Sequence, residues 1–237
     1  MRVGLPGAVA PLAAALARHP NRGVGRHTNA VRDKAHSALE KLGYTDAGVE
    51  LPTAVMSAAR VVALMHAGAA DARTARAGAE SLRDIAASDA GRAACVAADA
   101  PGILVSILTT HVGVATVCHF SCWALTNIAS SDAGTAACVA AGAPHAVVAA
   151  LTTHARSSDV LSYASRRASS TSSIVCLYAS WALLNLAGSD PAHRAAIVAA
   201  GAVAPLAAAL ARHPGETREK AHAALEKLGY TDAGVKK

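Results

Sequence analysis

Two tryptophan–asparagine pairs recur at one spacing in this chain of 237 residues. Trp123 precedes Asn127 by four residues, and Trp181 precedes Asn185 by four. On a helix, the members of each pair lie on one face, a turn apart. An asparagine amide can both donate to and accept from an extended peptide backbone. A tryptophan ring adds an apolar wall and a face that attracts a cation. The chemistry that these residues offer is noncovalent recognition.

No sequence motif points to catalysis. The chain contains no H-E-x-x-H, G-x-S-x-G or P-loop motif. Several of the eleven histidines belong to repeated segments rather than to a site, namely His19 and His213 in A-R-H-P and His36 and His222 in K-A-H. We therefore expect no enzyme, no catalytic residue, no cofactor and no small-molecule substrate.

The five cysteines indicate packing rather than chemistry. Cys95 and Cys138 lie 43 residues apart in the same A-A-C-V-A-A segment, which predicts two buried packing positions. Cys118 and Cys122 can meet on one helical face, but too few other ligands lie near them for a metal site. With Cys176 the number is odd and there is no C-x-x-C pair, which favours a reducing compartment and no metal.

The helices that must position the two pairs belong to a repeat. A central leucine recurs with steps of 43, 43, 58 and 42 residues, at Leu39, Leu82, Leu125, Leu183 and Leu225. A fixed period of this size is typical of a stacked helical solenoid. We therefore predict an all-α chain that forms one solenoid over residues 1–237. Its repeats are expected at 1–45, 46–88, 89–131, 132–189 and 190–237, with three helices each.

Local signals place the helices within these repeats. Helices are expected over Val31–Leu42, Ala58–Met65 and Ala75–Ala86, with another around Pro52. The dipeptides Ser88-Asp89, Ser131-Asp132 and Ser189-Asp190 each offer an N-cap for a short alanine-rich helix. The first residues have some features of a signal peptide, but G-A-V-A-P-L-A-A-A-L-A-R-H-P at 7–20 returns unchanged at 201–214. A repeat helix is therefore the better interpretation of this stretch.

The repeated pattern resembles the armadillo repeat. It runs from D-x-x-x-A-A-C/I-V-A-A-G-A-P/V to A-x-W-A-L-x-N-I/L-A, and W-A-L-T-N-I-A is similar to the third helix of the importin-α family. The resemblance implies a right-handed α-solenoid of about five three-helix repeats. It also implies that Trp123, Asn127, Trp181 and Asn185 form a concave groove, which in the importin-α family holds basic nuclear-localisation peptides.

Charged residues stand at the same positions in the other repeats. Glu80 and Asp84 replace the pair in the preceding repeat, where they would suit a Lys or Arg of a ligand or else be ordinary solvated charges. The first repeat instead has Ser37 and Lys41. The last has Ala223 and Lys227, and the lysines would repel a basic ligand. Three hypotheses follow: a module that binds an extended peptide, an importin-α-like adaptor for basic cargo, and a scaffold without a groove.

The charge distribution bounds the partners. The net charge of +6 divides into +5 over residues 1–41, −1 over 42–211 and +2 over 212–237. A nucleic-acid partner is not expected from this uneven basicity. No run of 18 apolar residues is free of charges and helix breakers, so no membrane span is expected, and the location should be cytoplasmic or nuclear. The first repeat lacks a first helix, so its apolar face should be covered by a partner, by self-association or by further sequence.

A Ser/Arg-rich insert accounts for the one long step in the period. It covers roughly Ala155 to Ser173 and contains S-R-R-A-S-S-T-S-S, a composition that favours a mobile surface loop. Arg166-Arg167-Ala168-Ser169 matches the R-R-x-S pattern of basophilic kinase sites. Short patterns of this kind arise by chance, so Ser169 is a candidate phosphorylation site set against an unmodified loop.

Overall fold

The computed structural model describes residues 6–18, 34–35, 37–39, 44, 56–155 and 166–237. The chain forms two compact units, Met1–Pro52 and Thr53–Lys237. The described ranges are helical and contain no β-strand, although an isolated antiparallel bridge joins Tyr230 to Lys236. The prediction of an all-α repeat fold is confirmed.

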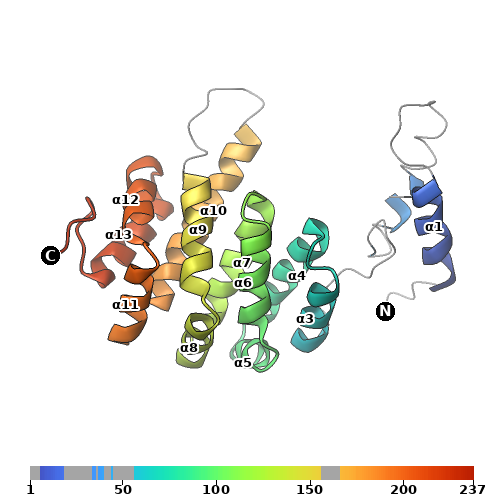
Figure 1. Ribbon diagram of the computed structural model, residues 1–237, viewed down its shortest axis with the longest axis horizontal. Coiled ribbons are helices and arrows are strands. Elements are labelled where there is room, and N and C mark those ends of the chain that lie inside the picture. Colours follow the sequence, from blue (N-terminus) through green and yellow to red (C-terminus); the bar gives the residue numbers. More distant parts are fainter. Residues whose placement is uncertain (1–5, 19–33, 36, 40–43, 45–55, 156–165) are drawn as a thin grey trace. The chain divides into compact units, whose positions relative to one another are not determined.

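The larger unit is a stack of helix triplets (Figure 1). The stack begins with α3 (Ala58–Ala67) and α4 (Ala72–Ile85). Three triplets follow: α5 (Asp89–Ala97), α6 (Ala100–Thr110) and α7 (Ala115–Ile128); α8 (Asp132–Ala140), α9 (Ala143–Ala155) and α10 (Arg166–Leu186); α11 (Pro191–Ala199), α12 (Val203–Arg212) and α13 (Glu216–Leu228).

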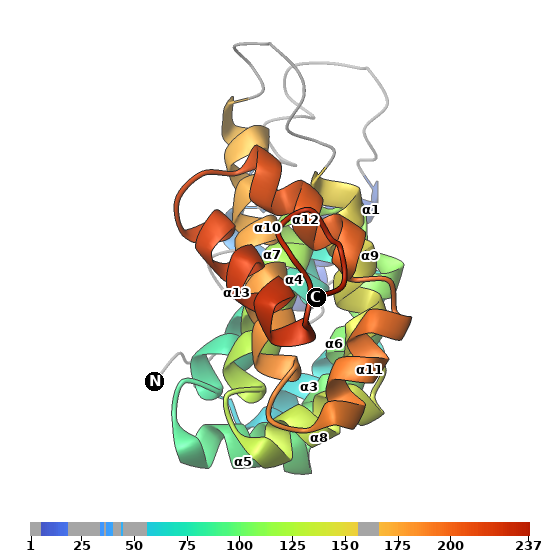
Figure 2. The same cartoon turned by 90° about the vertical axis from the view of Figure 1, so that its left-hand side faces the viewer.

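Corresponding helices of successive triplets pack side by side. The third helices form one layer, in which α7 packs between α4 and α10, and α10 between α7 and α13. The second helices α3, α6, α9 and α12 form another layer, and the first helices α5, α8 and α11 a third. Figure 2 shows this stack turned by 90°, with the last triplet, α11, α12 and α13, toward the viewer. The layer of third helices carries both tryptophan–asparagine pairs.

The predicted N-caps begin the first helix of each triplet. The hydroxyl of Ser88 accepts a hydrogen bond from the Gly91 amide at 3.1 Å, and that of Ser131 accepts one from the Gly134 amide at 3.2 Å. In the last triplet the carboxylate of Asp190 takes this role, accepting from the Ala192 amide at 2.8 Å. Each cap satisfies an N–H group that the first turn leaves without a helical partner.

Glycine allows the first helix to cross the preceding third helix at close range. A Cβ atom on Gly91 would lie 1.7 Å from the carbonyl oxygen of Ile85, and one on Gly134 would lie 1.8 Å from that of Ile128. No rotamer can relieve a contact between a Cβ atom and backbone. These two glycines therefore set how closely neighbouring triplets approach.

Helix corners between the first and second helices use left-handed backbone. Gly142 and Gly201 each have φ 81°, whereas the corresponding residue of the first complete triplet is Asp99, with φ 55°. The Asp99 side chain makes no capping hydrogen bond in this position. Left-handed backbone is strained for a residue with a Cβ atom, so Asp99 is a local weak point of the stack.

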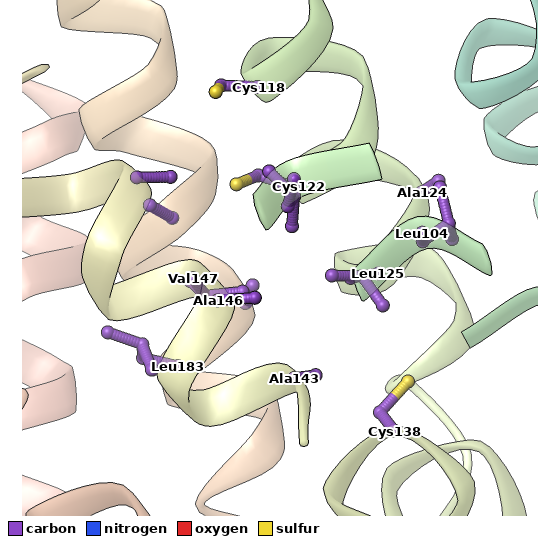
Figure 3. Packing of buried hydrophobic residues seen from close by; sticks show 14 of the residues in the cluster. Leu104, Cys118, Cys122, Ala124, Leu125, Cys138, Ala143, Ala146, Val147 and Leu183 are labelled. Atoms are coloured by element: carbon purple, nitrogen blue, oxygen red, sulfur yellow. The ribbon is translucent and has the colours of Figure 1, made fainter. Parts of the chain in front are cut away.

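The core consists mainly of small side chains. The central leucines of the larger unit, Leu82, Leu125, Leu183 and Leu225, are all fully buried. Figure 3 shows Leu125, Val147 and Leu183 among alanines such as Ala143 and Ala146. In the smaller unit, Leu39 is buried with Val9, Leu16 and Ala35, and the equivalent residues of the last repeat are Val203, Leu210, Ala221 and Leu225. The duplicated sequence therefore contributes equivalent residues to both cores.

All five cysteines lie in this core as free thiols. Burial raises the pKa of the Cys95 thiol to about 11 and that of Cys138 to about 12. The prediction that these two residues serve packing is confirmed. Within the described ranges, no group of three or more His, Cys, Asp or Glu side chains could hold a metal ion.

Helix α10 begins earlier in the chain than the sequence indicates. The prediction of a loop through Ser173 is wrong for residues 166–173, because α10 begins at Arg166. The buried side chains of Ser172, Val175 and Cys176 anchor this part of the helix, and adding residues to an existing helix costs far less than starting one. Residues 156–165 lie outside the described ranges, as do the helix expected around Pro52 and most of that expected over residues 31–42.

No single helix in the described ranges has both the length and the hydrophobicity to cross a membrane. Three pairs of consecutive helices pass that test together, but each pair is bent by 74–79°.

The glycine crossing predicts a strong stability effect. Gly134→Ala should lower the free energy of unfolding by roughly 2 kcal/mol, because the new methyl group overlaps the Ile128 carbonyl. Gly113→Ala is the matched control, since no atom lies within 4 Å of its added Cβ atom. Urea denaturation followed by circular dichroism measures both variants. Equal effects of the two substitutions would contradict the close crossing.

The strained corner predicts a stabilising substitution. Asp99→Gly should raise the free energy of unfolding by about 0.5 kcal/mol, because glycine adopts this backbone without strain. The reverse change, Gly142→Asp, should lower it by about 1 kcal/mol. The same denaturation experiment tests both, and a loss of stability in Asp99→Gly would count against strain at Asp99.

Candidate functional site

The predicted site residues lie on three neighbouring third helices. Glu80 and Asp84 are on α4, Trp123 and Asn127 on α7, and Trp181 and Asn185 on α10. Asp84 is exposed and the other five are half-buried. We refer to the partly exposed residues of α4, α7, α10 and α13 as the third-helix face. The repeat thus brings all six predicted residues onto one face.

A row of stacked rings runs along this face. The rings of Trp123 and Tyr178 have centres 4.5 Å apart and planes inclined by 15°, and Tyr178 continues to Trp181 at 6.2 Å. His119 stacks on Phe120 at 4.5 Å and on Tyr178 at 5.3 Å. Such offset stacking between aromatic rings is favourable beyond the apolar area that it buries. The row joins α7 to α10.

Sequence reasoning missed Phe120, Tyr178 and His119 as members of this row. A signal for two of them was present, because Phe120 and Tyr178 each stand three residues before a tryptophan. Residues three apart are neighbours on a helix surface. Aromatic residues three positions before the tryptophans therefore extend the ring row.

Cations of the chain itself cover both tryptophan rings. The guanidinium carbon of Arg83 lies 4.5 Å from the centre of the Trp123 ring and 5.1 Å from that of Phe120. The Lys220 ammonium lies 4.4 Å from the centre of the Trp181 ring. All three distances are within the range of cation–π attraction. Neither cation was among the residues predicted for the site.

The two predicted acids are paired inside the chain. Arg83 contacts Asp84 at 2.6 Å and Glu80 at 3.9 Å, and Arg76 contacts Glu80 at 3.3 Å. Arg83 also donates from Nε to Asp84 at 2.8 Å. The charges that were expected to receive a ligand's Lys or Arg are thus already balanced by arginines of the same helix.

Each asparagine joins its helix to the preceding third helix. Nδ2 of Asn127 donates to the Arg83 carbonyl at 3.0 Å, and Nδ2 of Asn185 donates to the Thr126 carbonyl at 3.0 Å. An amide has a second N–H and an oxygen that can accept. Within the described part of the chain, no donor bonds to Oδ1 of either asparagine. One N–H and the oxygen of each side chain therefore remain for a ligand.

The α13 end of the face carries neither a tryptophan nor an asparagine. Ala223 and Lys227 on α13 occupy the positions of the tryptophan and the asparagine, and Lys227 is exposed. In the first repeat Ser37 is half-buried, whereas Lys41 lies outside the described ranges. Ser169 is in the first turn of α10, and its side chain is likewise outside them. Its phosphorylation stays a prediction.

His119 is held neutral by its surroundings. Burial, aided by the positive charge of Arg83, lowers the pKa of this imidazole to about 4, and its Nε2 atom is buried without a hydrogen-bond partner within the described chain. Burial also raises the pKa of the Tyr178 hydroxyl. Both shifts reflect a poorly hydrated aromatic row, and the positive charge of Arg83 adds to the shift of His119 and opposes that of Tyr178.

The comparisons with known proteins concern the fold. No protein-family model and no curated protein matches the sequence. An engineered protein solved by the Northeast Structural Genomics Consortium is similar, with a TM-score of 0.57 and 23% identity over 100% of this chain and 87% of that one. The designed armadillo repeat protein YIII(Dq)4CqI has a TM-score of 0.53 and 21% identity, over 94% and 82%.

These likenesses confirm the predicted armadillo-type solenoid. At such identities they concern the arrangement of the helices and not what the chain binds. The finer resemblance to importin-α stays a prediction that rests on the sequence motif alone.

The position of His119 predicts a titration. Its imidazole should titrate near pH 4 in the folded protein, against an ordinary value of 6.5. Because the unfolded chain then binds a proton that the folded chain does not, the free energy of unfolding should fall as the pH falls from 6.5 to 4. NMR of the imidazole protons measures the pKa directly.

His119→Phe, which retains a stacked ring, should reduce this loss of stability at low pH. The loss should not vanish, because burial also lowers the pKa of His154 and His213. A His119 pKa close to 6.5 would contradict the buried position beside Arg83.

Proposed function

We propose that this protein binds an extended polypeptide segment along the third-helix face and that it performs no chemistry. The observation that carries the proposal is the aromatic row, flanked by two asparagine oxygens that accept no hydrogen bond within the described chain. Buried or half-buried polar groups are normally satisfied by a partner or by water. A peptide backbone supplies donors at regular intervals and so suits a repeated acceptor.

The repeat makes the two asparagines equivalent. Asn127 and Asn185 each donate to the last turn of the preceding third helix, so their oxygens present themselves in the same way on α7 and α10. A segment lying across the helices would meet one asparagine after the other. The adjacent ring row would keep water from the backbone hydrogen bonds. This geometry favours an extended strand over a globular surface.

The importin-like hypothesis adds a requirement to this proposal. It needs Lys or Arg side chains of the cargo on the faces of Trp123 and Trp181, where Arg83 and Lys220 now lie. It also needs negative charge, but Glu80 and Asp84 are paired with arginines. We therefore propose the extended-peptide function without a basic cargo.

The scaffold hypothesis has an observation in its favour as well. Stacking and the amide–carbonyl bonds hold α4, α7 and α10 together, which is a packing role for the same residues. That role uses one N–H of each amide and leaves the oxygen unexplained. Binding studies on variants of the asparagines separate the two hypotheses.

A displayed library of random peptides of about ten residues provides the test. Peptides selected on the wild-type protein should bind the Asn127→Ala, Asn185→Ala double variant at least about tenfold more weakly. The variant loses two backbone hydrogen bonds, each contributing about 1 kcal/mol. Titration calorimetry with the synthesised peptides measures the difference.

The control is the double variant Thr109→Ala, Thr110→Ala on α6. Both residues are exposed on a second helix, and their hydroxyls donate to carbonyls of that same helix. Because each asparagine also stabilises the stack, thermal unfolding of every variant should show that it is folded at the temperature of the titration. Failure of the wild-type protein to select any peptide, or equal affinity in the asparagine variant, would contradict the proposed function.

A further inference from the structure

The two cations over the tryptophans come from opposite sides of the ring row. Arg83 belongs to α4, which precedes α7, and Lys220 belongs to α13, which follows α10. Each reaches across to the tryptophan of the neighbouring helix. The two positions where a bound segment could place a side chain on a tryptophan face are therefore both occupied by this chain.

Arg83 is held firmly in its position. Its side chain is only 16% exposed, and it bonds to Asp84 through two nitrogens while also pairing with Glu80. Its carbonyl accepts the hydrogen bond from Asn127. A ligand cation that replaced the guanidinium on Trp123 would have to break both ion pairs. A ligand cation that did not replace it would lie beside a like charge.

Lys220 has no such counter-ion among the residues that the structure describes. In the described part of the chain it takes part in no ion pair, although Glu216 stands one turn earlier on α13. Lys227 on the same helix is also without an ion pair there. An ammonium group that lies on a ring of the third-helix face without an ion pair is suited to receive a carboxylate.

We propose that Arg83 and Lys220 determine the charge preference of the third-helix face: they exclude Lys and Arg side chains from the two tryptophans, and Lys220 binds an Asp or Glu side chain of the segment. This inference rests on the proposed function. The expected partner is an extended segment with an acidic residue at the α13 end. The importin-like motif would instead predict a basic segment.

Parallel selection from the same random peptide library tests the inference. Peptides selected on the wild-type protein should be depleted in Lys and Arg and enriched in Asp and Glu. Selection on the double variant Arg83→Gln, Lys220→Gln should reverse this preference, because Asp84 and both rings become available to ligand cations. For the best wild-type peptide, Glu→Lys exchange should weaken binding to the wild type at least about tenfold and strengthen binding to the variant.

The matched control is the double variant Arg76→Gln, Lys227→Gln. It removes the same net charge from the same two helices, but Arg76 lies over Phe120, at 5.6 Å, and within the described chain neither residue lies on a tryptophan ring. It should keep the wild-type preference. Reversal in this control as strong as in the Arg83, Lys220 variant would show a general charge effect and overturn the assignment to these two residues.

The outcomes separate this inference from the function on which it rests. If peptides selected on the wild-type protein were enriched in Lys and Arg, the inference would be overturned while the peptide-binding function stands. The same holds if the peptides selected on the wild type and on each variant had equal average charge. Failure of every protein to select a peptide would overturn the function and the inference together. Binding of acidic peptides that is lost in Lys220→Gln supports both.

The pKa of His119, measured without added peptide, tests the position of Arg83. Its positive charge helps to lower the pKa of His119, so Arg83→Gln should raise that pKa from about 4, whereas Arg76→Gln should leave it closer to the wild-type value. NMR titration of the imidazole measures the shift. An unchanged pKa in Arg83→Gln would overturn the position of the guanidinium over the ring row.

Discussion

The contact between successive third helices is the constraint on which the rest of the structure depends. Each repeat is too small to bury its apolar face alone and does so against its neighbours. The fully buried leucines Leu82, Leu125 and Leu183 lie among alanines, so the helices approach closely. Gly91 and Gly134 extend that closeness to the first helices of the following triplets. The asparagine-to-carbonyl bonds then fix the register of one third helix against the next.

This register creates the ring row and places charges on it. Trp123 meets Tyr178 across the α7–α10 contact, and Arg83 and Lys220 reach the rings from the two outer helices. The same side chains therefore stabilise the stack and shape the surface that a partner would meet. An asparagine that uses one N–H inside the protein and keeps its oxygen outside serves both purposes. The face combines structural and binding roles in single residues.

The sequence allowed the fold to be predicted because its signals are local and repeated. The leucine period, the Ser and Asp caps and the duplicated segment at 7–20 and 201–214 each depend on residues close in the chain. The extent of α10 was missed, since buried Val175 and Cys176 extend a helix into a Ser-rich segment that composition alone assigns to a loop. Helix boundaries depend on such tertiary packing more than on propensity.

The six predicted site residues were correctly expected on neighbouring helices, but the cations that lie over the tryptophan rings were not predicted. Arg83 pairs with acids one and three residues away, which a charge pattern could have revealed. Its position over Trp123, and that of Lys220 over Trp181, depend on the offset between helices and on side-chain rotamers, which no spacing encodes.

The central claim is that a polypeptide lies on the third-helix face, and the two tryptophans report on that face directly. Trp123 and Trp181 are the only tryptophans of the chain, and both belong to the ring row. The most direct measurement is intrinsic tryptophan fluorescence while a library-selected peptide without aromatic residues is added. We predict a saturable change of emission with the dissociation constant found by calorimetry, because the peptide replaces water beside both rings. Saturated binding with unchanged emission would place the peptide elsewhere and contradict the account.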